Sequence, residues 1–497
     1  MNHSPYRINL HLKTYSSSIL IAFLLIAYIC IAPNSDLFFY DNKRIAEISL
    51  ILLTLITLST SKYAQNNLTY SLYFLDRSSI FLLSLLLGLG ITSALLAPSS
   101  RHAFIEVISF FSLFIIALQC SPVWRHFPKL LPWIGLALLI SIFIQEIKFI
   151  SYYFAFIINN HNFNFHDFFF TFTHPRFFNQ YQLWTLPLIT LFITLDHPYL
   201  KDKHTRYLLW AIAIIWWIMF FTTNGRGVVV AVTSSYLITF SIFKQKTKKF
   251  FKTTLILNLL GFIFYQVLFH LIPHIMSNDL SLLTTGDTQA FSIRSTSSGR
   301  LTHLWPKALQ LITENPWLGI GPMHYHAWNG GIVLAHPHNS VLQIGAEWGI
   351  PALLCVLILL YRTFRDWIHR FNSHSLNKTN STFTLSVIGL TFSLCSAFVL
   401  SLFSGVIVMP MSHLMGILVI SFSLSICQTG NLTVEPKITK QNWTMTFIFS
   451  ILTISYFWLL SPDLIPRLVN SAFTPDNILG VNGPRFWMVG GDIGNKL

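Results

Sequence analysis

The feature that most constrains this chain is a series of apolar runs, each roughly 16 to 25 residues long and separated by short polar links. A helix of that length matches the hydrocarbon thickness of a bilayer. Because 53% of the 497 residues are hydrophobic and only 10% are charged, one soluble core could not hide this much apolar surface. The sequence therefore predicts an all-α polytopic membrane protein with about 12–13 transmembrane helices. The predicted spans lie near residues 18–33, 46–61, 78–97, 103–120, 130–150, 181–196, 207–222, 227–243, 253–272, 340–361, 384–409, 412–428 and 443–460.

Lysine and arginine residues set the predicted orientation of these spans. A net charge of +14 would suggest a nucleic-acid partner for a soluble chain, but here the basic residues concentrate in alternate links, so we expect no nucleic-acid partner. The positive-inside rule then places the N-terminus in the cytoplasm and the segments 151–180, 273–339 and 461–497 outside. The expected organisation is one group of helices within 1–272 and a second within 340–460.

The three external segments differ in character. Segment 151–180 is dense in aromatic side chains between 161 and 174, which commonly sit at headgroup depth but could instead line a lipid path or stack on sugars. Segment 273–339 is the longest link, and its apolar spacing predicts a helix over 301–312. The tail 461–497 has little periodicity, so we expect a poorly ordered or peripheral extension.

Polar residues that can do chemistry recur where external segments meet apolar spans. His336 and His338, in His-Pro-His-Asn, stand at the start of the predicted span 340–361. A titratable imidazole at a membrane boundary is costly to keep unless it does chemistry. Arg226 and Arg300 fall at the same predicted face, each after a glycine. Two converging guanidinium groups would bind the oxygens of a pyrophosphate, and His338 could take a proton near neutral pH.

Each of these residues also has a structural interpretation. Arg226 could extend from the start of its helix toward the interface, and Arg300 could only anchor the loop. His338 and Asn339 could form a helix-capping pair without chemistry. Glu347, nine residues after His338, is too far along a helix to orient that imidazole, so a structural role is expected.

A zinc site is a further alternative, since the external segment contains two His-x-His sequences. Its ligands would be His324, His326, His336 and His338. No cysteine or acidic residue lies between His324 and His338, which disfavours this interpretation, and we expect neither a metal nor another cofactor.

The chain resembles the O-antigen ligases and their relatives among O-antigen polymerases and pilin or protein O-oligosaccharyltransferases. The resemblance is strongest over 297–352, where Ser-Gly-Arg-Leu, Glu-Asn-Pro-Trp-Leu-Gly-Ile-Gly and His-Pro-His-Asn-Ser follow in the family's order. His338, Asn339 and Gly349 match the ligase motif, whereas its last position is Ala352 here.

Two arginines outside that stretch resemble further family segments. Arg226 lies in Asn-Gly-Arg-Gly, which resembles a Ser-Arg-Gly segment, and Arg176 opens Arg-Phe-Phe-Asn-Gln, a looser version of an earlier outer-loop motif. The resemblance therefore adds Arg176 to the expected substrate-binding residues Arg226, Arg300, Asn339 and His336.

The resemblance implies a metal-independent, inverting glycosyltransferase with a C-type fold in the bacterial inner membrane. Its donor would be an undecaprenyl-pyrophosphate-linked glycan, and its acceptor lipid A-core, as in lipopolysaccharide biosynthesis, or a protein such as pilin. His338 would be the catalytic base of a periplasmic active site, with a large periplasmic loop over 273–339 and a periplasmic tail.

Two other functions remain open at this stage. A polymerase that extends one lipid-linked repeat with another would use the same chemistry. A non-enzymatic flippase or transporter of lipid-linked glycans is less favoured, because the sequence has no internal repeat and few ionisable residues within its spans, chiefly Glu106, Lys148 and Glu347.

Overall fold

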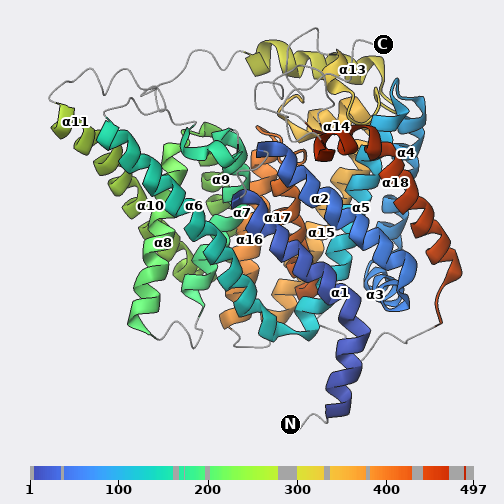
Figure 1. The fold of residues 1–497 in the computed structure, drawn as a ribbon, viewed down its shortest axis with the longest axis horizontal. Helices are drawn as coiled ribbons and strands as arrows, with labels where there is room; N and C mark the ends of the chain where they lie inside the picture. Colours follow the sequence, from blue (N-terminus) through green and yellow to red (C-terminus); the bar gives the residue numbers. More distant parts are fainter. Residues whose placement is uncertain are drawn as a thin grey trace.

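The computed structural model describes residues 5–34, 39–159, 167–172, 174–195, 202–277, 299–328, 336–375, 381–427, 440–469 and 486–487. Within these residues the chain is helical and contains no strand. The long helices stand side by side, with α1 beginning at one end of the bundle and α18 ending at the other (Figure 1). The predicted all-α polytopic architecture is confirmed.

Each predicted span overlaps at least one helix in the described residues, although the predicted span 384–409 ends in the loop 402–409 that follows α16. The long helices are α1 (Pro5–Ile31), α2 (Phe39–Thr60), α4 (Arg77–Leu96), α5 (Ser100–His126), α6 (Leu131–Asn159), α7 (Pro175–Thr194), α8 (Lys203–Thr222), α9 (Arg226–Phe243), α10 (Lys248–Gln266), α15 (Ile350–Ser375), α16 (Ser381–Ser401), α17 (Pro410–Cys427) and α18 (Trp443–Val469). The shorter ones are η1 (Ala32–Asn34), α3 (Lys62–Tyr73), η2 (Pro128–Leu130), η3 (Asp167–Phe172), η5 (Lys244–Thr247), η6 (Val267–Leu271), α11 (Ile272–Ser277), η8 (Arg300–Leu304), α13 (Trp305–Glu314), η9 (Tyr325–Trp328) and α14 (Ser340–Trp348).

Length and hydropathy alone identify nine described segments that could cross a membrane, or ten if the bent pair α2 and α3 forms one span. One of the nine, Arg226–Ile275, holds both α9 and α10. The rings of Tyr236 in α9 and Phe251 in α10 are 4.9 Å apart, which a continuous helix would not allow, so these helices are two separate passes. The more polar α7 and α15 fall outside the nine.

The prediction of a single span over 340–361 is wrong. The chain leaves the helix at Gly349, where φ is 87°, and begins again as α15. Segment 319–321 covers the end of α14: Ile320 N–H donates to the Ala346 carbonyl (2.9 Å) and Gly321 N–H to the Glu347 carbonyl (3.0 Å). A Cβ on Gly319 (φ 68°) would lie 2.4 Å from the Glu347 carbonyl carbon, so this close approach requires glycine. Helix α14 is thus a separate short element.

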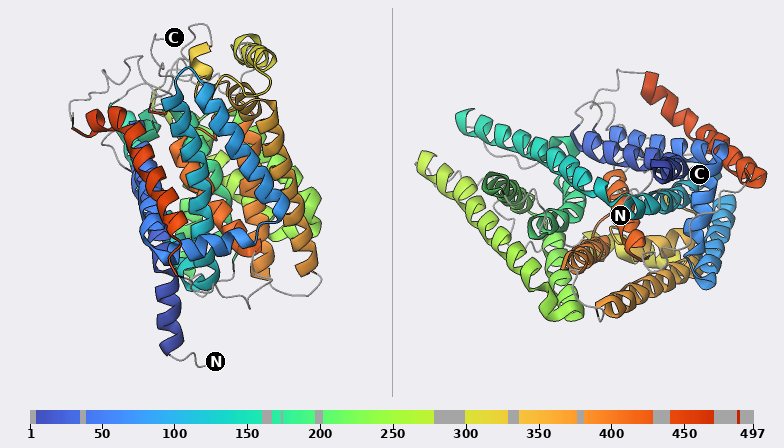
Figure 2. Two further views of the ribbon diagram at one scale, coloured as in Figure 1. Left: turned by 90° about the vertical axis from the view of Figure 1, so that its right-hand side faces the viewer. Right: turned by 90° about the horizontal axis from the view of Figure 1, so that it is seen from below.

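Residues 299–328 of the predicted external segment 273–339 form a partly helical layer over the bundle end opposite the start of α1 (Figure 2). The helix expected over 301–312 is confirmed by η8 and α13. Helix α13 buries Ala308 and Leu311 against Ala346 of α14. Residues 278–298 and 329–335 lie outside the described part of the chain.

Three aromatic side chains of the predicted segment 151–180 are internal. Phe168, Phe169 and Phe172 of η3 are each no more than 4% exposed. Their rings pack with Phe149 of α6 and Phe178 of α7. These three therefore form a core beneath the surface and do not sit at an interface with headgroups; residues 160–166 and 173 lie outside the described part.

The predicted tail 461–497 begins later than expected, because α18 continues to Val469. Two described tail residues contradict a peripheral position. Phe486 is 5% exposed and Trp487 is 1% exposed, and both belong to the main hydrophobic core. Arg44 of α2 donates from Nε to the Phe486 carbonyl (2.8 Å). The remaining residues, 470–485 and 488–497, lie outside the described part.

Candidate active site

The predicted site segments meet at one end of the bundle. The first turns of α7 contact both the start of α9 and the loop 402–409 between α16 and α17: Gln180 Nε2 donates to Ser404 Oγ (2.8 Å). A Cβ on Gly225, which precedes α9, would lie 2.3 Å from Asn179 Nδ2. In the same loop 402–409, Gly405 packs against the ring of His336. Helices α7, α9 and α16 therefore hold Arg176 and Arg226 at the level of the His-Pro-His-Asn segment.

His338 lies immediately before the N-cap of α14. Its φ of 54° is in the left-handed region, which a non-glycine residue seldom occupies and which often marks a functional position. Its backbone N–H donates to His336 Nδ1 (3.2 Å), and its own Nδ1 is buried without a hydrogen-bond partner among the described residues. A neutral imidazole in this setting has an acceptor or donor atom available for a ligand.

Burial and cationic neighbours both lower the pKa of His338. Burial lowers the pKa of His338 from 6.5 to about 3, with further lowering by Arg300, Arg176 and His174. The pKa of Arg300 is lowered by burial and by Arg176. These groups therefore share one region of space, as predicted for His338 and Arg300, and the imidazole is uncharged at neutral pH.

Arg226 takes a more distant position in this arrangement. It is exposed at the first turn of α9 and is not among the charges that lower the pKa of His338. Gly227, its neighbour, lies against Phe403 in the loop 402–409. The structure thus places Arg226 at the same end of the bundle, but only Arg176 and Arg300 of these three arginines lower the pKa of His338.

The other predicted substrate contacts have local roles in the structure. Asn339 is the N-cap of α14, with Oδ1 accepting from the N–H groups of Val341 (3.0 Å) and Leu342 (3.1 Å). His336 is 4% exposed, and its ring packs against that of His338 with centroids 4.3 Å apart. Asn339 therefore caps α14, as the structural interpretation expected. In contrast, the buried Nδ1 of His338 has no hydrogen-bond partner among the described residues.

Sequence reasoning missed His174. This half-buried residue is the N-cap of α7, where its Nδ1 accepts from the Arg176 N–H (3.0 Å). It is followed by proline, as is His336, so a second His-Pro pair before a polar helix start was the available signal. His174 orients the first turn that carries Arg176 and contributes to the electrostatics of His338.

The geometry argues against the zinc alternative and supports a structural Glu347. His324 Nε2 accepts from the Ser99 N–H (3.0 Å), and its Nδ1 is 2.7 Å from the Pro322 carbonyl, so both nitrogens are engaged. Across the described ranges, no group of three His, Cys, Asp or Glu residues could hold a metal. Glu347 is fully buried and accepts from the Tyr325 N–H (2.9 Å), which fixes the layer to α14.

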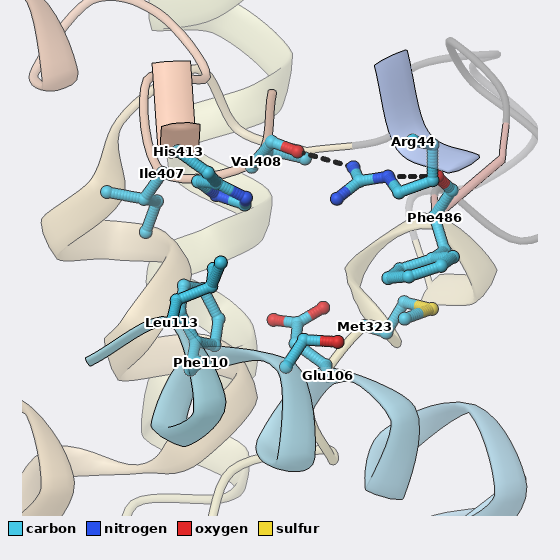
Figure 3. A pocket seen from close by; sticks show the side chains of 10 residues that line it. Arg44, Glu106, Phe110, Leu113, Met323, Ile407, Val408, His413 and Phe486 are labelled. Carbon is cyan, nitrogen blue, oxygen red and sulfur yellow. Dashed lines mark hydrogen bonds between the residues drawn. The ribbon is translucent and has the colours of Figure 1, made fainter. Parts of the chain in front are cut away.

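A cavity lies beside the loop 402–409, which contributes Ile407 and Val408 to its lining. It is lined by Arg44, Glu106, Ser109, Phe110, Leu113, Met323, Ile407, Val408, His413 and Phe486 (Figure 3). Arg44 donates to Glu47 (2.8 Å) and to the Val408 carbonyl (2.7 Å), and Glu47 also pairs with His413 (3.0 Å). Sequence reasoning missed this buried cluster of Arg44, Glu47 and His413, which holds the loop 402–409 through the Val408 carbonyl.

Comparison with known proteins finds a family match over one region of the chain. Residues 211–357 match the family model described as O-antigen ligase. The matched region contains Arg226, Arg300, His336, His338 and Asn339, whereas Arg176 precedes it. No curated protein matches the chain.

Proposed function

We propose that this member of the O-antigen ligase family, a family of membrane glycosyltransferases, transfers a glycan from undecaprenyl pyrophosphate to an acceptor hydroxyl. The reaction would take place at the periplasmic face of the bacterial inner membrane, with lipid A-core or a protein such as pilin as acceptor. The observation that carries the proposal is the uncharged imidazole of His338, with an unpartnered Nδ1, beside Arg300 and Arg176.

The donor would bind through its pyrophosphate. Arg300 is half-buried and Arg176 is exposed, and the charge of Arg176 lowers the pKa of Arg300, so the two positive charges repel one another. A pyrophosphate would relieve this repulsion and accept several charge-assisted hydrogen bonds. Arg226, exposed at the same end of the bundle, would contact the donor farther from His338. The isoprenoid tail would lie against the apolar helices.

The chemical step would be a single displacement. His338 takes the proton of the acceptor hydroxyl, and the acceptor oxygen forms a bond to the anomeric carbon of the donor sugar. The bond from that carbon to the pyrophosphate oxygen breaks, and undecaprenyl pyrophosphate leaves with the electron pair. The arginines stabilise the negative charge that develops on the leaving group, so their side chains lower the energy of the transition state electrostatically. Attack from the opposite face inverts the anomeric centre.

Purified protein should form product without a metal, nucleotide or ion gradient. The assay would combine protein in detergent, a defined undecaprenyl-pyrophosphate-linked glycan and EDTA, with three separate acceptors: lipid A-core, a pilin peptide, and a second lipid-linked glycan. Product with one of the first two indicates a ligase, and product with the third a polymerase. Absence of product with all three, together with movement of the lipid-linked glycan across vesicle bilayers, would instead support transport.

The pH dependence should differ between free protein and donor complex. In free protein the pKa of His338 is lowered to about 3, so kcat/KM for the donor should remain constant down to acidic pH and fall only as the imidazole protonates. Bound pyrophosphate compensates the arginine charges and raises this pKa, so the acid limb of kcat should lie at higher pH. Arg176→Ala removes a cation and should move the limb of kcat/KM upward. Coincident limbs in both profiles would contradict the assignment.

A further inference from the structure

His336 is positioned to support His338. The ring of His336 lies between the ring of His338, 4.3 Å away between centroids in an edge-to-face arrangement, and the backbone at Gly405. A Cβ on Gly405 would lie 2.5 Å from His336 Cε1 and 2.6 Å from Nε2. Because His336 is only 4% exposed, little of its surface remains for a substrate.

A hydrogen bond connects the two histidines through the backbone. The His338 N–H donates to His336 Nδ1 (3.2 Å), across a left-handed residue with φ of 54°. Such a conformation is unfavourable for a residue other than glycine and persists only where surrounding contacts determine it. The acceptor on His336 is one such contact, and it holds the backbone of His338, the residue whose side chain is the proposed base.

The loop that carries Gly405 is itself held from two directions. Ser404 Oγ accepts from Gln180 of α7 (2.8 Å), and the Val408 carbonyl accepts from Arg44 of α2 (2.7 Å). Figure 3 shows Arg44 joined to both Val408 and Phe486 at the rim of the cavity. Gly405 therefore presents a fixed surface to His336.

We propose that His336 and Gly405 form a brace that holds the imidazole of His338 in its reactive position. His336 is then a positioning residue that acts through His338, and the absent side chain at Gly405 provides the space for its ring. The inference rests on the proposed function of His338 as the base and reassigns His336, which the sequence placed among the substrate-binding residues.

A double-mutant cycle tests the brace. Gly405→Ala should lower kcat about tenfold or more, with KM for the donor unchanged, because the methyl group displaces His336 and a shift of about 1 Å at a reactive group can cost about 100-fold. In a His336→Ala background the same methyl group meets no ring, so Gly405→Ala should cause no further loss. A loss of equal size in both backgrounds would overturn the proposal.

Two substitutions at His336 separate the hydrogen bond from the ring. His336→Asn keeps an acceptor near the place of Nδ1 and should retain kcat within about threefold, whereas His336→Phe keeps the ring, loses the acceptor and should lower kcat about tenfold. A rise in the donor KM for both variants with unchanged kcat would identify His336 as a substrate contact and contradict the brace. Membrane abundance and thermal unfolding in detergent identify any variant that fails to fold.

A chemical readout keeps the brace testable without glycan transfer. Carbethoxylation of His338 can be followed by mass spectrometry, and in His336→Asn and His336→Phe the peptide around 336–338 reports His338 alone. The rate should be several-fold higher in His336→Phe than in His336→Asn, since the imidazole is released only when the acceptor is lost. Equal rates would overturn the brace. Failure of the proposed function appears separately, as absence of transfer by the wild-type protein.

Discussion

Replacing His338 with alanine is expected to lower glycan transfer about 1000-fold while the protein still reaches the membrane, because a positioned general base contributes about 10² to 10⁴ in rate. His338 combines an uncharged imidazole with a buried, unpartnered Nδ1. Among the described residues, the charges that act on its pKa come from Arg300, Arg176 and His174, and none is a carboxylate. The measurement is the initial rate of transfer by purified protein at saturating donor and acceptor.

Two further variants separate loss of the base from loss of structure. His338→Asn preserves a residue type that tolerates φ of 54° but cannot act as a base near neutral pH, so its rate should fall as far as that of His338→Ala. His204→Ala removes an exposed imidazole from the first turn of α8, at the opposite end of the bundle, and should leave the rate unchanged. Transfer by His338→Ala at more than a tenth of the wild-type rate would refute the base assignment.

The fold was predictable wherever a long apolar run determined a helix, because burying so many apolar residues in a bilayer leaves the backbone few other options. The break at Gly349 was not. The apolar pattern continues across Gly349 into α15, and the chain departs from the helix because segment 319–321, far away in sequence, binds the last carbonyls of α14. Hydropathy contains no information on such a tertiary contact.

Candidate site residues could be found from the sequence where a charged or titratable side chain lies beside an apolar segment. His338 and Arg300 were identified because a histidine and an arginine beside apolar segments are costly, and the structure places them in one electrostatic environment. Arg44 lies in the polar link between the predicted spans 18–33 and 46–61, where the sequence gives no sign of burial. It is 2% exposed and paired with Glu47, a partner that is itself inside a predicted span. Arg44 holds the Val408 and Phe486 carbonyls, and both residues lie far from it in sequence.

Burial and the nearby positive charges keep His338 uncharged, and they also make it a weak base until the donor arrives. A pKa of about 3 leaves the imidazole deprotonated but gives little driving force for taking a hydroxyl proton. A pyrophosphate between Arg300 and Arg176 removes part of their effect, so donor binding should raise the basicity of His338. The arginines would thus couple binding of the donor to activation of the acceptor.

Arg300→Ala is accordingly expected to lower kcat/KM for the donor about 10²–10³-fold, the effect of losing one charged group that stabilises a leaving anion. Arg300→Lys should recover only part of this loss, since an ammonium group lacks the planar fork that binds two phosphate oxygens. Arg300→Ala also removes a cation that lowers the pKa of His338, so the acid limb of kcat/KM should move to higher pH in Arg300→Ala but remain near its wild-type position in Arg300→Lys.

Arg206→Ala provides the matched control, because Arg206 is an exposed arginine in the first turn of α8 at the opposite end of the bundle. It should change neither kcat/KM nor the position of the acid limb. If Arg300→Ala weakens transfer but leaves the acid limb in place, the guanidinium binds donor without influencing His338, and the coupling between donor binding and base strength is refuted. If neither quantity changes, the pyrophosphate binds elsewhere, with Arg226 as the next arginine to replace.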